Sequence, residues 1–105
     1  MTVQLITTLT RPSTDVPWHS FSNGRGFYLN DAYYLLNWHD CGKIVSTAFS
    51  VSEDGLTGTV IREFSDWQSL DDFYNDENLV SCRTQANTYN TSMRIKNINI
   101  EIKEI

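Results

Sequence analysis

The chain has 105 residues, a mass of 12.1 kDa, 40% hydrophobic residues and a formal net charge of −5 at pH 7. This length allows one domain with one hydrophobic core, and the hydrophobic content is too high for a disordered chain. The acidic balance and the scattered basic residues argue against nucleic-acid binding, which needs a basic patch, and against attachment to an anionic membrane.

The compartment is predicted from what the sequence lacks. No apolar run approaches the roughly 18 residues of a membrane span, and the N-terminus has neither the basic nor the apolar region of a signal peptide. We therefore expect a cytoplasmic protein in which Cys41 and Cys82 stay reduced.

The first third of the chain begins with one clear element. Residues 2–10 alternate apolar and polar side chains, which predicts a strand with one face on the core. Residues 13–28 are the least readable part, where Ser13-Thr14-Asp15 could cap a short helix with Trp18 packing inward. Residues 32–39 favour a helix that carries Tyr34 and Trp38 at helical spacing.

The most readable stretch runs from Lys43 to Tyr74. Residues 45–51 alternate like a strand, and Asp54-Gly55 is among the strongest short-range hairpin signals. The return strand over residues 56–64 has one face formed by Leu56, Gly58, Val60, Arg62 and Phe64.

Two helices and a last strand follow this hairpin. Ser65 and Gln68 fit a capping box, so we expect Ser65 to be the N-cap of a helix. The side chains expected on the inner face of that helix are Trp67, Leu70, Phe73 and Tyr74. Asn75-Asp76 interrupts the pattern before a second helical run from Glu77 to about Tyr89. The last strand, residues 94–104, alternates strictly, with Ile98, Ile100 and Ile102 on one face and polar residues towards water.

The predicted order is strand, helix, strand, strand, helix, strand. We expect a single α+β domain over residues 1–105 with the ferredoxin-like βαββαβ fold, a four-stranded antiparallel sheet with helices on one face.

The pattern DGLTGTVIREFSDWQSLDDFYNDENL, followed by NTYN, resembles the C-terminal half of the dimeric α/β-barrel superfamily. Its antibiotic-biosynthesis-monooxygenase-like members carry the same hairpin, short helix and second helical segment. The resemblance covers about residues 43–105, whereas residues 13–42 are longer and more aromatic than the first helix of that superfamily.

The resemblance implies a homodimer in which the two sheets face each other as a dimeric α/β barrel. The superfamily includes cofactor-independent oxygenases and haem-degrading enzymes. The haem-degrading branch uses a histidine in the second half of the chain, whereas His19 and His39 both lie in the first half. We therefore expect no haem, no metal and no other cofactor.

One short segment groups residues capable of chemistry. Trp38, His39 and Cys41 are weak candidates for catalysis, although a helix end with its exit turn accounts for them as well. Trp18, Tyr34 and Trp38 are candidates to line a pocket for a flat aromatic ligand, and core packing explains them equally well.

Three functional hypotheses follow, and the sequence leaves open whether the protein is an enzyme. The first is a small homodimeric binding or accessory module without catalytic machinery. The second is a cofactor-independent monooxygenase-like enzyme acting on an aromatic small molecule with Tyr34, Trp38 and His39. The third is a viral (phage) or mobile-element protein that binds a host protein through its acidic helix.

Overall fold

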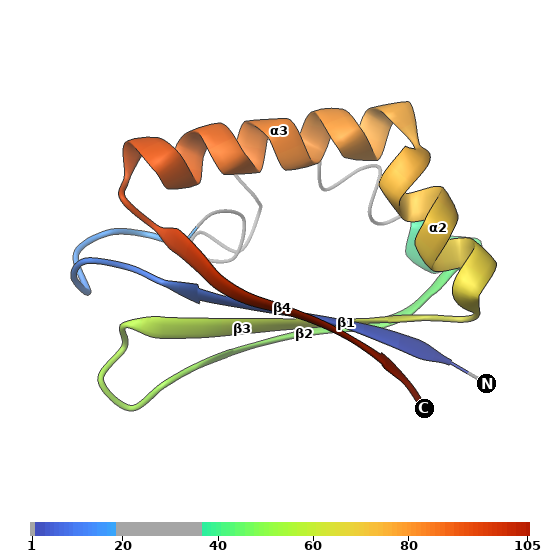
Figure 1. The fold of residues 1–105 in the computed structure, drawn as a ribbon, viewed down its shortest axis with the longest axis horizontal. Coiled ribbons are helices and arrows are strands. Elements are labelled where there is room, and N and C mark those ends of the chain that lie inside the picture. Colours follow the sequence, from blue (N-terminus) through green and yellow to red (C-terminus); the bar gives the residue numbers. More distant parts are fainter. Residues whose placement is uncertain (1, 19–36) are drawn as a thin grey trace.

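The computed structural model describes residues 2–18 and 37–105, which form one antiparallel sheet with helices on one face (Figure 1). The elements are β1 (Val3–Thr10), β2 (Ile44–Val51), β3 (Thr57–Phe64), α2 (Trp67–Asn75), α3 (Glu77–Ser92) and β4 (Lys96–Glu104). The strand order is β2-β3-β1-β4. The ferredoxin-like prediction is therefore confirmed. Most of the helix predicted over residues 32–39 lies outside the described residues, and residues 37–40 are helical.

The β2–β3 hairpin has the turn that its sequence predicts. Gly55 has a φ of 75°, a value that glycine reaches without the steric cost of a side chain. The Asp54 carboxylate accepts hydrogen bonds from Ser52 Oγ at 2.6 Å and from the Leu56 N–H at 3.0 Å. These bonds favour the ionised form and lower the pKa of Asp54. Arg11 Nε donates to Gly55 O at 2.7 Å, which ties the tip of the hairpin to the end of β1.

The core lies between the sheet and α2. Val3 pairs with Phe64, which also pairs with Ile44, so these three side chains form a row across β1, β3 and β2. All three are almost completely buried. The whole core cluster consists of Val3, Leu5, Trp38, Ile44, Phe64, Leu70, Phe73 and Leu79.

The start of α2 differs from the prediction in two respects. The N-cap is Asp66, not Ser65, because the Asp66 carboxylate accepts the Ser69 N–H at 2.7 Å. A carboxylate forms a stronger charge-assisted bond there than a hydroxyl. Trp67 was expected in the core, but 49% of its surface is exposed and its Nε1 donates to Glu104 Oε1 at 2.7 Å. As the first residue of the helix, it lies beyond the edge of the buried face.

Asp76 alone separates the two helices, whereas the sequence predicted an interruption over Asn75-Asp76. The Asp76 N–H donates to Asp72 O at 2.8 Å, and its carboxylate accepts the N–H groups of Asn78 and Leu79. Asp76 therefore ends α2 and begins α3. The helix α3 has 16 residues and extends one turn past the predicted end. Neither α3 nor any other helix in the described part of the chain is both long and apolar enough to cross a membrane.

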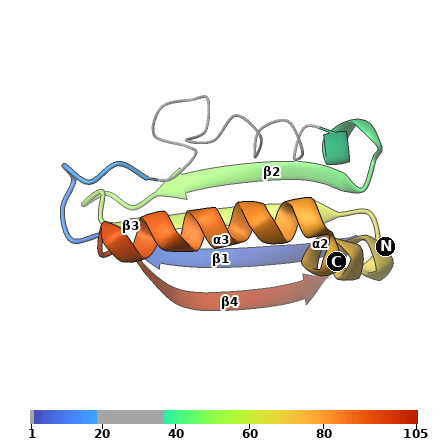
Figure 2. The same ribbon diagram turned by 90° about the horizontal axis from the view of Figure 1, so that it is seen from above.

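The environment of β4 contradicts the prediction. Every residue of β4 is exposed, and Ile98, Ile100 and Ile102 are 56%, 56% and 45% exposed. Ile102 pairs with Leu5 and Ile100 with Thr7, so both lie on the side of the sheet that carries the helices. Figure 2 shows the reason: α3 runs over β3 and β1, and β4 lies beside it.

We expect Arg94→Gly to stabilise the protein. Arg94 has a φ of 60°, and its N–H donates to Thr91 O at 3.2 Å as α3 ends. A residue with a Cβ is strained in this left-handed conformation by about 1–2 kcal/mol. Because glycine also gains entropy on unfolding, the net gain should be up to about 1 kcal/mol.

Urea denaturation measures this gain. The matched control is Arg94→Ala, which removes the guanidinium but keeps the Cβ and should bring no gain. A glycine variant no more stable than the alanine variant would contradict the explanation.

Candidate functional site

The cluster predicted from sequence, Trp38, His39 and Cys41, does not converge on one point. Trp38 is buried in the core, where its ring meets Phe73 edge to face at 5.8 Å. His39 Nε2 lies 3.0 Å from Thr47 Oγ1, a hydrogen bond that joins the end of the first helical segment to β2. Cys41 is an exposed free thiol. The three side chains thus have three different environments.

No metal site is found in residues 2–18 and 37–105, because no three His, Cys, Asp or Glu side chains gather there in a way that could hold an ion. The pocket candidate Tyr34 lies outside the described residues.

The other pocket candidate, Trp18, is buried against the sheet. Its ring meets Phe49 edge to face at 5.8 Å, and the guanidinium carbon of Arg11 lies 4.7 Å from its centroid. The sheet approaches closely here, since a Cβ built on Gly58 would lie 3.2 Å from Trp18 Cζ2 and 2.9 Å from two Phe49 ring atoms. The indole Nε1 of Trp18 is buried and has no hydrogen-bond partner within residues 2–18 and 37–105.

Arg62 is an unexpected residue on the face of the sheet that the helices cover. It lies on β3 opposite Leu5, and therefore on the face that the helices cover. Its guanidinium carbon lies 5.3 Å from the centroid of the Phe73 ring, and its Nε is buried without a hydrogen-bond partner. Burial, with a further contribution from the charge of Arg83, lowers the pKa of Arg62 to about 10. A desolvated cation without an acceptor is costly, and proteins normally pair it.

The helix α3 contributes a third unpaired buried atom, Gln85 Oε1. Gln85 lies one turn before Tyr89 on the same side of the helix. The Tyr89 hydroxyl donates to Pro17 O at 2.6 Å, next to Trp18 in the chain. Burial raises the pKa of Tyr89. This side of α3 therefore looks towards the segment that carries Trp18.

We call the region between α3 and the sheet the α3–sheet layer and define it by the residues of these three atoms, Trp18, Arg62 and Gln85. Gly58 and Arg62 are four residues apart on one face of β3, a distance of about 13 Å in an extended strand. Trp18 packs at the Gly58 end of this stretch, and Arg62 stands at the other.

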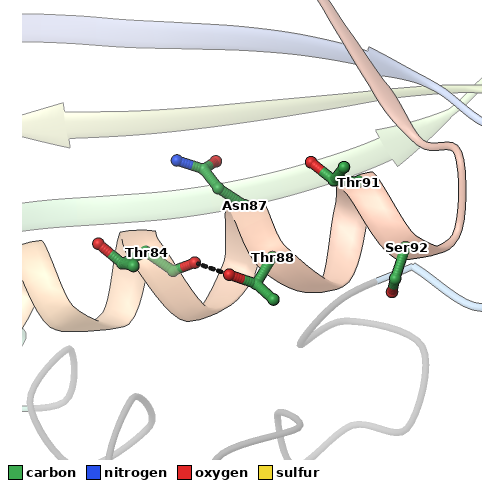
Figure 3. A pocket seen from close by; sticks show the side chains of 5 residues that line it. All are labelled: Thr84, Asn87, Thr88, Thr91 and Ser92. Atoms are coloured by element: carbon green, nitrogen blue, oxygen red, sulfur yellow. Dashed lines mark hydrogen bonds between the residues drawn. The ribbon is translucent and has the colours of Figure 1, made fainter.

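A depression lies on α3, lined by Thr84, Asn87, Thr88, Thr91 and Ser92 (Figure 3). It is shallow and open, with a volume of about 510 Å³. Three of its four hydroxyl groups already donate to helix carbonyls, Thr84 to Val80 O, Thr88 to Thr84 O and Ser92 to Tyr89 O. These bonds leave the hydroxyls little donor capacity for a ligand, so the depression is a poor candidate site.

Sequence reasoning did not select Arg62 or Gln85 as site residues. The signal for Arg62 was present, because strand alternation places it on the same face as Val60 and Phe64. No such signal exists for Gln85, because a glutamine in a polar helix is ordinary.

Comparison with known proteins identifies the fold. No protein-family model matches the chain, and no curated protein matches it in sequence. Among solved structures, a candidate antibiotic biosynthesis monooxygenase from Deinococcus radiodurans is similar, with a TM-score of 0.63 and 10% identity over 100% of this chain and 92% of that one.

Two further structures are similar over nearly the whole chain. Rv0793 from Mycobacterium tuberculosis has a TM-score of 0.57 and 14% identity over 98% of this chain and 91% of its own. Protein SO0527 from Shewanella oneidensis has a TM-score of 0.53 and 8% identity over 97% and 86%. The chain therefore has the fold of antibiotic-biosynthesis-monooxygenase-like proteins, and the remote resemblance seen in the sequence is confirmed at the level of the fold.

We expect Gly58→Ala to destabilise the protein by about 1–3 kcal/mol, the usual cost of adding a methyl group to a packed layer. The new Cβ would lie 2.9 Å from two ring atoms of Phe49, so that ring or Trp18 must move. Urea denaturation monitored by tryptophan fluorescence would report both the loss and the displacement.

Thr57→Ala is the matched control, since Thr57 is the adjacent residue and faces the other side of β3. It should cost less and leave the fluorescence maximum unchanged. Equal losses in the two variants would show that Gly58 is not a point of close packing.

Proposed function

We propose that this protein is a small-molecule-binding module that holds an aromatic ligand in the α3–sheet layer. The observation that carries the proposal is that three buried polar atoms have no partner among the residues that the structure describes, namely Trp18 Nε1, Arg62 Nε and Gln85 Oε1. An unsatisfied buried polar group costs about 1–3 kcal/mol, and native proteins keep few of them. A ligand that pairs with these atoms would remove the cost.

The aromatic character of the layer supports a flat ligand. Trp18, Phe49 and Phe73 line the interior between the helices and the sheet, and edge-to-face contacts hold their rings in place. Pockets for small molecules commonly combine such apolar walls with a few polar groups that orient the ligand.

A ligand panel tests the proposal. Two-ring and three-ring aromatic compounds, both neutral and charged, should include at least one that raises the melting temperature and changes tryptophan fluorescence. Val60→Phe, which adds bulk on the β3 face between Gly58 and Arg62, should abolish both effects.

The matched control is Val80→Phe, which adds the same bulk at a position of α3 that is 40% exposed, and it should bind normally. A panel without any response, or equal responses in the two variants, would reject a ligand site in this layer.

We also propose that the protein is a homodimer in which the uncovered faces of two sheets meet. On that face Ile6 pairs with Ile61, which pairs with Ala48, so an apolar row crosses three strands. Its neighbouring rows carry threonine, serine, glutamine and glutamate side chains, and Gln4 Nε2 donates to Glu63 Oε1 at 3.2 Å. A narrow apolar centre with a polar rim is the usual anatomy of an interface.

Sedimentation velocity at micromolar concentration should therefore give a dimer, and Ile61→Lys should shift it to monomer because two lysines would meet at the centre. Thr57→Lys, at the end of the same face, should have a smaller effect. A wild-type protein that sediments as a monomer would reject the dimer.

The second candidate function is a cofactor-independent oxygenase that acts on the same aromatic ligand. Its support is the fold shared with the D. radiodurans protein. The candidate residues Trp38 and His39 already contact Phe73 and Thr47, respectively. Oxygen uptake and a new oxygenated product with a bound panel compound would favour the enzyme over the binding module.

A further inference from the structure

Two guanidinium groups share one aromatic ring in the α3–sheet layer. The guanidinium carbons of Arg62 and Arg83 lie 5.3 Å and 5.2 Å from the centroid of Phe73. Cation–π contacts stabilise each of them by about 0.5–2 kcal/mol. Two like charges near one ring also repel each other, and the charge of Arg83 contributes to the lowered pKa of Arg62. The layer therefore carries positive charge in excess.

The two arginines differ in their hydrogen bonds. Arg83 Nη1 donates to Phe73 O and Nη2 to Tyr74 O, both at 2.8 Å, so Arg83 binds the last carbonyls of α2. In contrast, Arg62 Nε is buried and has no acceptor. Among the described residues, no carboxylate contributes to the pKa of Arg62. Arg83 thus has a structural role, whereas the Nε of Arg62 has no acceptor among the described residues.

We infer that the ligand is an aromatic carboxylate whose acid group pairs with Arg62 and whose far end reaches Trp18. This inference rests on the proposed function and specifies the chemistry of its ligand. A carboxylate matches the planar fork of donors that an arginine presents. Trp18 Nε1 is also a donor, so the far end of the ligand carries an acceptor such as a phenolic oxygen.

The overall charge of the protein makes this selectivity meaningful. A chain with a net charge of −5 repels anions in general. A preference for a carboxylate over its uncharged counterpart must therefore come from a local cation in the site, not from the surface of the molecule.

The test compares 6-hydroxy-2-naphthoate with 6-hydroxy-2-naphthamide, which has nearly the same shape but no charge. Isothermal titration calorimetry on the full chain should show the naphthoate binding at least tenfold more tightly. Arg62→Met keeps a side chain of similar length and removes the charge, so it should bind the two compounds equally. Arg94→Met removes the same charge at an exposed position and should retain the preference.

A second measurement separates recognition from folding. Replacing a buried unpaired cation with an apolar side chain of similar size is often stabilising. Unliganded Arg62→Met should therefore melt a few degrees above the wild type while it loses the preference for the carboxylate. A purely structural Arg62 would instead give a variant that melts lower.

The outcomes distinguish the inference of a carboxylate ligand from the proposed function, the binding of an aromatic ligand. Equal affinity of the wild type for the two compounds, or a preference that survives in Arg62→Met, overturns the anionic ligand but leaves an aromatic-binding module. If neither these compounds nor the neutral panel bind, the proposed function fails and the inference fails with it.

Discussion

The hydrophobic core and the α3–sheet layer both depend on the packing of Phe73. From α2 its ring meets Phe64 of β3 at 5.0 Å and Trp38 at 5.8 Å, in both cases edge to face. Such pairs contribute about 0.5–1.5 kcal/mol beyond the area they bury. The same ring lies against the guanidinium groups of Arg62 and Arg83. Phe73 therefore belongs to both the hydrophobic core and the candidate site, so the position of α2 affects both.

The elements that could be predicted from sequence are those whose signals are local. The Asp54-Gly55 turn, the spacing of Leu70 and Phe73, and the interruption at Asp76 each depend on a few neighbouring residues. Together they supported the predicted order of elements along the chain and the ferredoxin-like fold. The N-cap was misassigned by one residue because Ser65 and Asp66 are both good caps, and only the path of the backbone decides which side chain reaches the free N–H groups.

The features that could not be predicted depend on which surfaces cover one another. Strand alternation correctly places Ile100 and Ile102 on the helix side of β4, but it cannot show that α3 lies over β3 and β1 and leaves them exposed. Charged residues of β4 such as Glu101 and Lys103 have a physical use, since charges on an edge strand oppose uncontrolled pairing with other chains. The same limit applies to Trp38, His39 and Cys41, which are adjacent in sequence but have different partners.

The lack of an acidic partner for Arg62 among the described residues is informative, because the chain has many acidic residues that could have paired with it. The sequence contains 13 acidic residues, and all but Asp31 lie in the described part of the structure. If Arg62 served only the fold, a buried ion pair would be the expected solution, since an unpaired buried charge is strongly destabilising. Along β3 an acidic residue does occur next to it, but Glu63 faces the other side of the sheet and accepts a hydrogen bond from Gln4. The buried Nε of Arg62 without an acceptor therefore supports the proposal that a ligand from outside the chain completes this site.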